Sequence, residues 1–322
     1  MHVTQFEWII TLGVTIAALL FDVIVIGRRP HEPSKRETAR YLTFYIVLAM
    51  FFGLWVWLFH GSQFGLEFFA GWLTEYSLSV DNLFIFVVIM TSFAVPRAYQ
   101  RQALFAGIVI ALIFRGIFIA LGAAAIARFS WVFYLFGAFL VYTALRLARG
   151  VTHETDAENA VVRFARNHLS ITETWHGAKL FVKDGSRRSA TPMALVVLAL
   201  GATDLIFALD SIPAIYGLTS EPYLVLAANV FALMGLRQLY FIVEGLLQRL
   251  VYLSKGLGVI LLFIGVKLIL HALRNNGLPF INGGKHIDVP EISTSVSLAV
   301  IAATLAVAAV ASVYATRGNE TG

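Results

Sequence analysis

Nine apolar stretches follow one another along the chain, each about as long as the hydrocarbon core of a bilayer is thick. Charged residues gather between these stretches, and polar and apolar positions do not alternate within them as they would in membrane strands. The pattern predicts an all-α membrane protein with nine transmembrane helices. The expected spans are residues 6–26, 41–59, 66–92, 103–126, 131–147, 193–217, 223–247, 256–273 and 296–314.

The composition agrees with this pattern. Of the 322 residues, 59% are hydrophobic and 13% are charged. Soluble domains average roughly 45–50% apolar and about 25% charged residues, so this much apolar surface cannot be buried in a water-soluble core. These residues include no cysteine, which excludes disulfides, thiolate metal sites and thiol redox chemistry.

The placement of the basic residues predicts a topology. A net charge of +5 would suggest nucleic-acid binding only if the basic residues shared one surface. Most of them lie instead in alternate connections, beginning with the one between the first two spans, and the positive-inside rule places these connections in the cytoplasm. The N-terminus is then outside and the C-terminus inside. No Lys or Arg precedes the first apolar run, so we expect a permanent span there rather than a cleaved signal peptide.

The one long connection, residues 150–191, is expected to be cytoplasmic. It contains an Asp184-Gly185 pair flanked by apolar residues, which predicts a small β-hairpin. The simplest interpretation is an ordered surface loop without chemistry.

Two segments of the chain resemble each other and indicate an internal repeat. In each, a Thr-acid pair is followed after five residues by a second acid and a small polar residue, and two basic residues follow at similar distances. The matches are Thr74-Glu75 with Thr203-Asp204, Asp81-Asn82 with Asp210-Ser211, Arg115 with Arg237, and Arg146 with Lys267.

Each repeat contains three predicted spans, so the second repeat enters the membrane from the opposite side. Inverted repeats of this kind are an architecture of secondary transporters, with the ion site near the midplane between the repeats. The expected division is two N-terminal helices in 1–64, a first repeat in 65–149, a cytoplasmic loop in 150–191, a second repeat in 192–274, and an extracytoplasmic loop with the last helix in 275–322.

The acids of the repeats fall inside predicted spans. A charged Asp at the centre of a membrane helix costs about 2.5–3.5 kcal/mol, so four carboxylates require a cation, a buried base or protons. Oxygen ligands without cysteine, and without histidine at mid-depth, favour a hard divalent ion such as Mn²⁺, Mg²⁺ or Ca²⁺. The candidate metal ligands are Glu75, Asp81, Asn82, Asp204, Asp210 and Ser211. Arg115 and Arg237 are the expected counter-ions, and Glu75 and Asp204 could carry protons instead of binding metal.

The third and sixth spans are antiparallel in this scheme. Glu75 should therefore lie level with Asp210, and Asp81 with Asp204. Residues six apart point about 120° away from each other around an ideal helix, so both acids of one helix cannot face the same site squarely. A break at Pro213 in one helix, or at the serines and asparagine of the other, would relax this constraint.

Five stretches in order resemble the TerC family of integral membrane proteins. The resemblance covers about residues 68–273, and its motifs are EYSLSVDN at 75–82, ATP at 190–192, ATDLIFALDSIP at 202–213, NVFALMGLR at 229–237 and FIGVK at 263–267. The family takes its name from tellurium resistance, and its members are similar to manganese exporters or are linked to supplying metal to secreted metalloproteins. The resemblance implies Mn²⁺ efflux and an acidic site. The matching positions are Glu75, Asp81, Asn82, Asp204 and Asp210.

We therefore expect an exporter of Mn²⁺ in the bacterial plasma (inner) membrane. The sequence has no nucleotide-binding motif, so a gradient, with protons as the counter-ion, is the expected drive. An enzyme is not expected, because the His-Glu-x-x-His helix of a zinc protease is missing, and neither is an organic cofactor. The expected partners are the divalent ion and the lipid bilayer. Two alternatives stay open: a calcium/cation exchanger, and a non-transporting membrane scaffold that assists metal loading through residues 150–191.

Overall fold

The computed structural model describes residues 1, 3–21, 35–129, 131–149, 172, 174–184, 187–243, 252–279 and 281–319. Each predicted span corresponds to one helix, with the described ends displaced by up to six residues; positions 22–26 and 244–247 lie outside the described residues. The helices are α1 (Gln5–Phe21), α2 (Lys35–His60), α3 (Ser62–Ser92), α4 (Arg97–Arg128), α5 (Val132–Ala148), α7 (Pro192–Tyr216), α8 (Pro222–Val243), α9 (Leu253–Arg274) and α10 (Thr294–Asn319), with a short 3-10 turn η3 (Asn282–Gly284).

Six of these helices are long and apolar enough to cross a membrane. They are Arg36–His60, Ser62–Ser92, Arg97–Arg128, Pro192–Tyr216, Leu253–Arg274 and Thr294–Thr316. Three shorter apolar helices, Gln5–Ala17, Val132–Ala148 and Pro222–Leu236, make up the rest of the predicted set. Large apolar side chains stand on the outside, including Leu58 of α2, which is 77% exposed, and Val307 of α10, which is 68% exposed. Such a surface suits a lipid environment.

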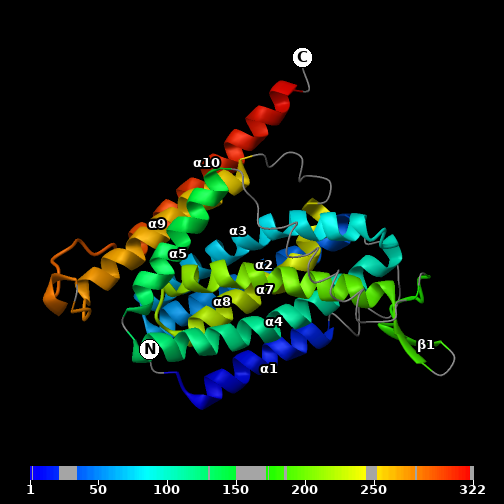
Figure 1. Cartoon of the computed structure of the whole chain (residues 1–322), viewed down its shortest axis with the longest axis horizontal. Coiled ribbons are helices and arrows are strands. Elements are labelled where there is room, and N and C mark those ends of the chain that lie inside the picture. The colour runs from blue at the N-terminus through cyan, green and yellow to red at the C-terminus, as the bar shows by residue number, and fades with distance from the viewer. Residues whose placement is uncertain are drawn as a thin grey trace.

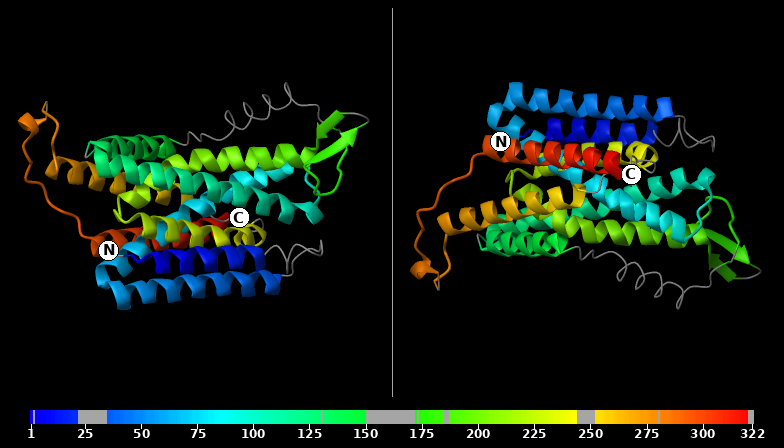
Figure 2. Two further views of the ribbon diagram at one scale, coloured as in Figure 1. Left: turned by 90° about the horizontal axis from the view of Figure 1, so that it is seen from below. Right: turned by 90° about the horizontal axis from the view of Figure 1, so that it is seen from above.

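A β-hairpin stands at one end of the molecule. Strands β1 (Phe181–Asp184) and β2 (Arg187–Ala190) pair antiparallel, with Phe181 opposite Ala190. The hairpin predicted from the Asp-Gly pair is thus confirmed in its strands, and the turn residues 185 and 186 lie outside the described part. The hairpin and the loop after α9 lie at opposite ends of the helix bundle in every view (Figures 1 and 2).

Helices α3 and α8 run side by side in the same direction. A Cβ added to Gly71 of α3 would lie 3.5 Å from the Cβ of Ala228, and one added to Gly235 of α8 would lie 3.3 Å from the ring of Tyr76. Residue numbers rise together along the contact, so the two helices are parallel.

Helices α4 and α7 form a second parallel pair. A Cβ added to Gly107 would lie 3.1 Å from the Leu200 side chain, and one added to Gly122 would lie 2.9 Å from the Tyr216 ring. The Tyr216 hydroxyl also donates a hydrogen bond of 2.7 Å to the carbonyl oxygen of Ile119. This pair therefore stays in contact over most of the length of α7.

Helices α5 and α9 form an antiparallel pair with a close backbone approach. A Cβ on Gly137 of α5 would lie 2.8 Å from the carbonyl oxygen of Gly265, and one on Gly265 would lie 3.0 Å from the carbonyl oxygen of Gly137. Further along, Gly258 of α9 approaches Leu147 of α5, so numbering runs in opposite directions. Small residues at such a crossing let two membrane helices pack backbone against backbone.

Helices α3 and α7 are continuous, which differs from the expected helix break. Pro213 lies within α7 only three residues before its last residue, Tyr216, so the helix ends soon after the disturbance. In α3 the hydroxyls of Thr74 and Ser77 donate to the carbonyl oxygens of Ala70 and Leu73, at 2.8 and 2.6 Å. Such bonds satisfy polar side chains one turn back on their own helix without opening it.

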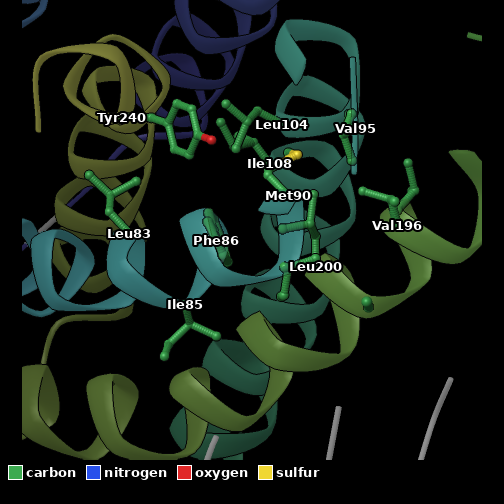
Figure 3. Close-up of a cluster of buried hydrophobic side chains, with 14 of the residues drawn as sticks. Leu83, Ile85, Phe86, Met90, Val95, Leu104, Ile108, Val196, Leu200 and Tyr240 are labelled. Carbon is green, nitrogen blue, oxygen red and sulfur yellow. The ribbon is translucent and has the colours of Figure 1, made fainter. Parts of the chain in front are cut away.

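An apolar cluster joins α3, α4, α7 and α8 on the side of the hairpin. Side chains from all four helices meet around Phe86, among them Leu104, Leu200 and Tyr240 (Figure 3). A second cluster joins α4, α7 and α8 toward the opposite end and includes Ile119, Ile212, Ile215, Tyr216 and Val225. The space between the two clusters holds the polar residues described next.

Candidate functional site

The guanidinium group of Arg115 is the centre of a buried polar cluster. It forms a bidentate salt bridge with Asp204, in which Nε donates to Oδ2 at 3.1 Å and Nη2 donates to Oδ1 at 3.0 Å. Nη1 also forms an ion pair with Glu75. The exposed fractions are 1% for Arg115, 0% for Glu75 and 2% for Asp204, so water is excluded from all three.

Two neutral groups complete the contacts of this arginine. Its Nη1 donates to the amide oxygen of Asn229 at 2.8 Å and to the hydroxyl of Ser211 at 3.3 Å. The other half of the Asn229 amide donates to the carbonyl oxygen of Val225 at 2.9 Å, which fixes the orientation of the side chain. We name the set of Glu75, Arg115, Asp204, Ser211 and Asn229 the Arg115 cluster.

The Arg115 cluster draws on four helices, and its level follows from their packing. Arg115 lies on α4 between the two apolar clusters, one ending at Ile108 and the other containing Ile119. A Cβ on Gly71 of α3 would lie 3.3 Å from Ile215 of α7. Because α3 and α7 are antiparallel, Glu75 and Ser211 lie level with each other, one helical turn deeper in the bundle than Gly71 and Ile215.

The charges of the Arg115 cluster do not balance. With both carboxylates ionised, two negative charges face one positive charge, and the net charge is −1. Apart from the ion pair with Arg115, the carboxylate oxygens of Glu75 have no hydrogen-bond partner among the described residues, and both are buried. Buried acceptors without a donor are rare in native proteins, and they mark places where a proton or a cation can bind.

Asp210 lies apart from the Arg115 cluster. It is half-buried, and its Oδ1 accepts a hydrogen bond of 3.1 Å from the Thr143 hydroxyl of α5. Glu75 of α3 is expected to lie level with Asp210 of α7. It lies at about this level, but the α7 side chain beside it is Ser211, because Asp210 faces α5. The unbroken α7 separates Asp204 and Asp210 around its axis, as an ideal helix requires.

Of the three remaining predicted site residues, only Asn82 has a described side chain, and it is not among the contacts of the Arg115 cluster. Asn82 is buried in α3 with 8% exposure. The side chains of Asp81 and Arg237 lie outside what the structure describes, although their backbones belong to α3 and α8. Within the described parts of the chain, no three His, Asp or Glu side chains are grouped closely enough to hold a metal ion. Among the predicted site residues whose side chains are described, the oxygen ligands with known contacts are those of the Arg115 cluster and of Asp210.

Sequence reasoning did not single out Asn229 and Thr143. Asn229 begins the 229–237 motif, about two helical turns before Arg237, but a lone amide in an apolar helix does not indicate which residue it will contact. Thr143 is one of many hydroxyls in the spans. Both become visible only when α5 and α8 are placed against the acidic helices.

The chain is similar to several known membrane proteins. A family model described as "Integral membrane protein TerC family" matches residues 60–320. An uncharacterized membrane protein of Mycobacterium tuberculosis is 46% identical over 317 residues, which cover 97% of this chain and 80% of the relative. A second uncharacterized membrane protein, from Myxococcus xanthus, is 37% identical over 98% of this chain and 94% of its own length.

A third relative has a descriptive name. The protein called "Putative membrane-bound redox modulator Alx" in Escherichia coli K12 is 36% identical over 80% of this chain and 84% of its own length. No solved structure was found to match the chain.

Proposed function

Because this chain belongs to the TerC family of integral membrane proteins, we propose that it exports divalent manganese from the cytoplasm in exchange for protons. The path runs through the acidic helices α3 and α7 and uses the carboxylates of Glu75, Asp204 and Asp210, with Asp81 as a fourth candidate. The membrane is the bacterial plasma membrane, with the hairpin end in the cytoplasm.

The Arg115 cluster is the observation that carries this proposal. Two carboxylates are held away from water between helices, where each charged acid costs about 2.5–3.5 kcal/mol. A single guanidinium compensates one of them and occupies the position that a cation between Glu75 and Asp204 would take. The carboxylate, amide and hydroxyl oxygens around it are of the type that hard divalent ions prefer.

The same charges suggest how protons exchange with metal. One proton on Glu75 makes the Arg115 cluster neutral, and this carboxylate has the acceptor to receive it. When the proton leaves, the site carries a net negative charge that attracts a cation. A transporter that binds protons or a divalent ion at the same carboxylates, but not both at once, couples the two gradients.

The helix pairs support the inverted repeat. The repeats match α3 with α7, α4 with α8, and α5 with α9. Under this match, the parallel pair α3–α8 is equivalent to the parallel pair α4–α7. The antiparallel pairs α3–α7 and α5–α9 each map onto themselves. A two-fold axis in the membrane plane would relate such pairs, and in transporters of this design the ion site lies where the repeats meet.

Two apolar clusters enclose the Arg115 cluster, one toward each end of the bundle. We infer a closed state in which the site faces neither side of the membrane. Alternating access would open one cluster at a time by moving one repeat against the other.

Transport into inside-out membrane vesicles tests the proposal. We expect Mn²⁺ uptake that depends on an imposed proton gradient and is competed weakly by Ca²⁺. Asp204→Asn and Asp210→Asn should each abolish uptake. Asp288→Asn makes the same chemical change at an exposed aspartate in the loop after α9, and should transport like the wild type.

The outcomes separate the alternatives. Uptake of Ca²⁺ in preference to Mn²⁺ would favour the cation exchanger. No uptake by the wild type under any gradient would overturn the transport proposal and favour a scaffold acting through the hairpin region. The name of the Escherichia coli relative refers to redox modulation. The 322 residues of this chain contain no cysteine, so they cannot carry out thiol exchange.

A further inference from the structure

A polar cavity of about 680 Å³ is lined in part by the loop after α9. This loop lies at the end of the bundle opposite the hairpin (Figure 1). It is surrounded by the start of α3, the turn after α7, the second half of α9 and the segment leading into α10. Its ionisable lining residues are Glu67, Lys267, His271 and Glu291, and most of the others carry hydroxyl or amide groups.

Glu67 is the most buried of the charged lining residues. Its side chain is 7% exposed, and its carboxylate accepts hydrogen bonds from the Gln63 amide at 3.0 Å and the Thr219 hydroxyl at 2.6 Å. Both donors are neutral, and no ion pair of Glu67 is found among the described residues. Hydrogen bonds therefore fix the orientation of the carboxylate, but no basic side chain among the described residues forms a salt bridge with it.

Lys267 lines the same cavity without contacting Glu67 directly. Its Nζ donates to the hydroxyl of Ser297 on α10 at 3.0 Å. The cavity thus holds an oriented carboxylate and, on another wall, an ammonium group tied to a different helix. A mobile cation could bind the carboxylate, and the ammonium group would then repel it.

The cavity and the Arg115 cluster share α3. Glu67 and Glu75 are two helical turns apart, about 12 Å along the axis. Gly71 lies between them and packs against Ile215. Tyr216 belongs to the apolar cluster around Ile215 and also lines the cavity, so this cluster separates the two carboxylates.

We propose that the cavity is the extracytoplasmic vestibule of the transport path, and that Glu67 is a second cation-binding carboxylate within it. The inference rests on the proposed function, in which a cation leaves the Arg115 cluster and passes Ile215 and Tyr216. Glu67 is then the next group that binds this cation. Glu67, the Thr219 hydroxyl and the Gln63 amide oxygen supply hard ligands for a divalent ion. Lys267 weakens the binding so that the ion leaves to the outside.

The chain allows a direct test because it has no cysteine of its own. Ser220 lines the cavity and is exposed, so Ser220→Cys places a single thiol in the proposed vestibule. A membrane-impermeant methanethiosulfonate added from outside should label it, and Mn²⁺ alone should slow the labelling. Adding Glu67→Gln should raise the Mn²⁺ concentration for half-protection by roughly tenfold or more, as expected when a charged ligand is replaced by a neutral one.

Two further variants control the test. Glu291→Gln makes the same change in the same cavity, but Glu291 is exposed and bonded to Arg274 at 2.5 Å, so protection should match that of Ser220→Cys alone. Lys267→Gln should act in the opposite direction and lower the half-protecting concentration. This variant keeps the test decisive if Glu67→Gln does not fold.

Labelling is read independently of transport, so the two proposals can fail separately. If the wild type transports Mn²⁺ but Glu67→Gln and Lys267→Gln leave protection unchanged, the vestibule site is wrong and the exporter stands. If Ser220→Cys cannot be labelled from outside, the vestibule is also wrong. If Mn²⁺ protects the thiol but vesicles show no uptake, the cation site stands and the exporter proposal fails.

Discussion

The choice of arginine at position 115 fits what its side chain contacts. Asp204 is held by two parallel hydrogen bonds, and the same guanidinium also reaches Glu75, Asn229 and Ser211. A guanidinium offers five donors in a rigid plane, whereas a lysine ammonium is a compact point charge. Only an arginine can serve this many acceptors from one position on α4.

Removing this cation should destabilise the protein strongly. Arg115→Gln leaves Glu75 and Asp204 buried without their counter-ion, and we expect a loss of about 3–5 kcal/mol in the free energy of unfolding. Thermal unfolding of the purified protein in detergent measures it. Adding Glu75→Gln and Asp204→Asn should restore most of the loss, and a triple variant as unstable as the single one would contradict the charge argument.

At this scale the sequence predicted that Arg115 has acidic partners, but it did not predict the geometry of the site. A buried arginine among more numerous acids requires an acidic partner, and Arg115 has two. The direction in which Asp210 points could not be predicted, because it depends on how α7 is rotated against α5 and whether the helix is broken at Pro213. Asn229 was missed because its role comes from packing alone.

Among the helix pairs, α5 and α9 depend most clearly on glycine residues at their contact. Gly137 and Gly265 face each other, and a Cβ on either would lie within 3.0 Å of backbone atoms of the other helix. Backbone cannot move aside as the tip of a flexible side chain can. The two glycines therefore set the distance between these helices.

Filling this contact should separate the pair. Gly265→Ala is expected to cost about 1–3 kcal/mol, as overpacking does in well-packed cores. Gly13→Ala in α1 is the matched control, because no other atom lies within 4 Å of its added Cβ, and it should be neutral or slightly stabilising. Thermal unfolding in detergent compares the two, and equal midpoints would mean that α5 and α9 do not pack this closely.

The described ends of the helices could be predicted from the sequence to within six residues. Apolar runs end where charges, Pro or Gly begin, and these signals are local; α4, for example, starts at Arg97, directly after Pro96, and α7 starts after the N-cap Thr191. The pairing of the helices could not be predicted in this way. It depends on which small residues face each other, and a single sequence does not show that.

At the scale of the whole molecule, two described connections mark the two ends of the bundle. The hairpin lies at one end, and the loop between α9 and α10 lies at the other (Figures 1 and 2). In the topology that we propose from the positive-inside rule, the hairpin end is cytoplasmic.

This orientation can be measured with two single thiols. Ala178→Cys precedes the hairpin and Lys285→Cys follows η3, and both positions are exposed. An impermeant maleimide should label Lys285→Cys on intact cells, and Ala178→Cys only after the membrane is opened. Labelling of both from the same side would contradict the topology and, with it, the direction of transport.

The Arg115 cluster also has a consequence for biosynthesis. Arg115 precedes Asp204 by 89 residues, which at roughly 5–20 residues per second delays the second acid by about 4–18 s of translation. Glu75 is already present in that interval, so we expect the nascent first half to enter the bilayer as a neutral Glu75–Arg115 pair. Asp204 then arrives at a cation that is already in place. On this expectation the arginine is inserted together with an acid, and the net negative charge of the Arg115 cluster arises when the second half docks.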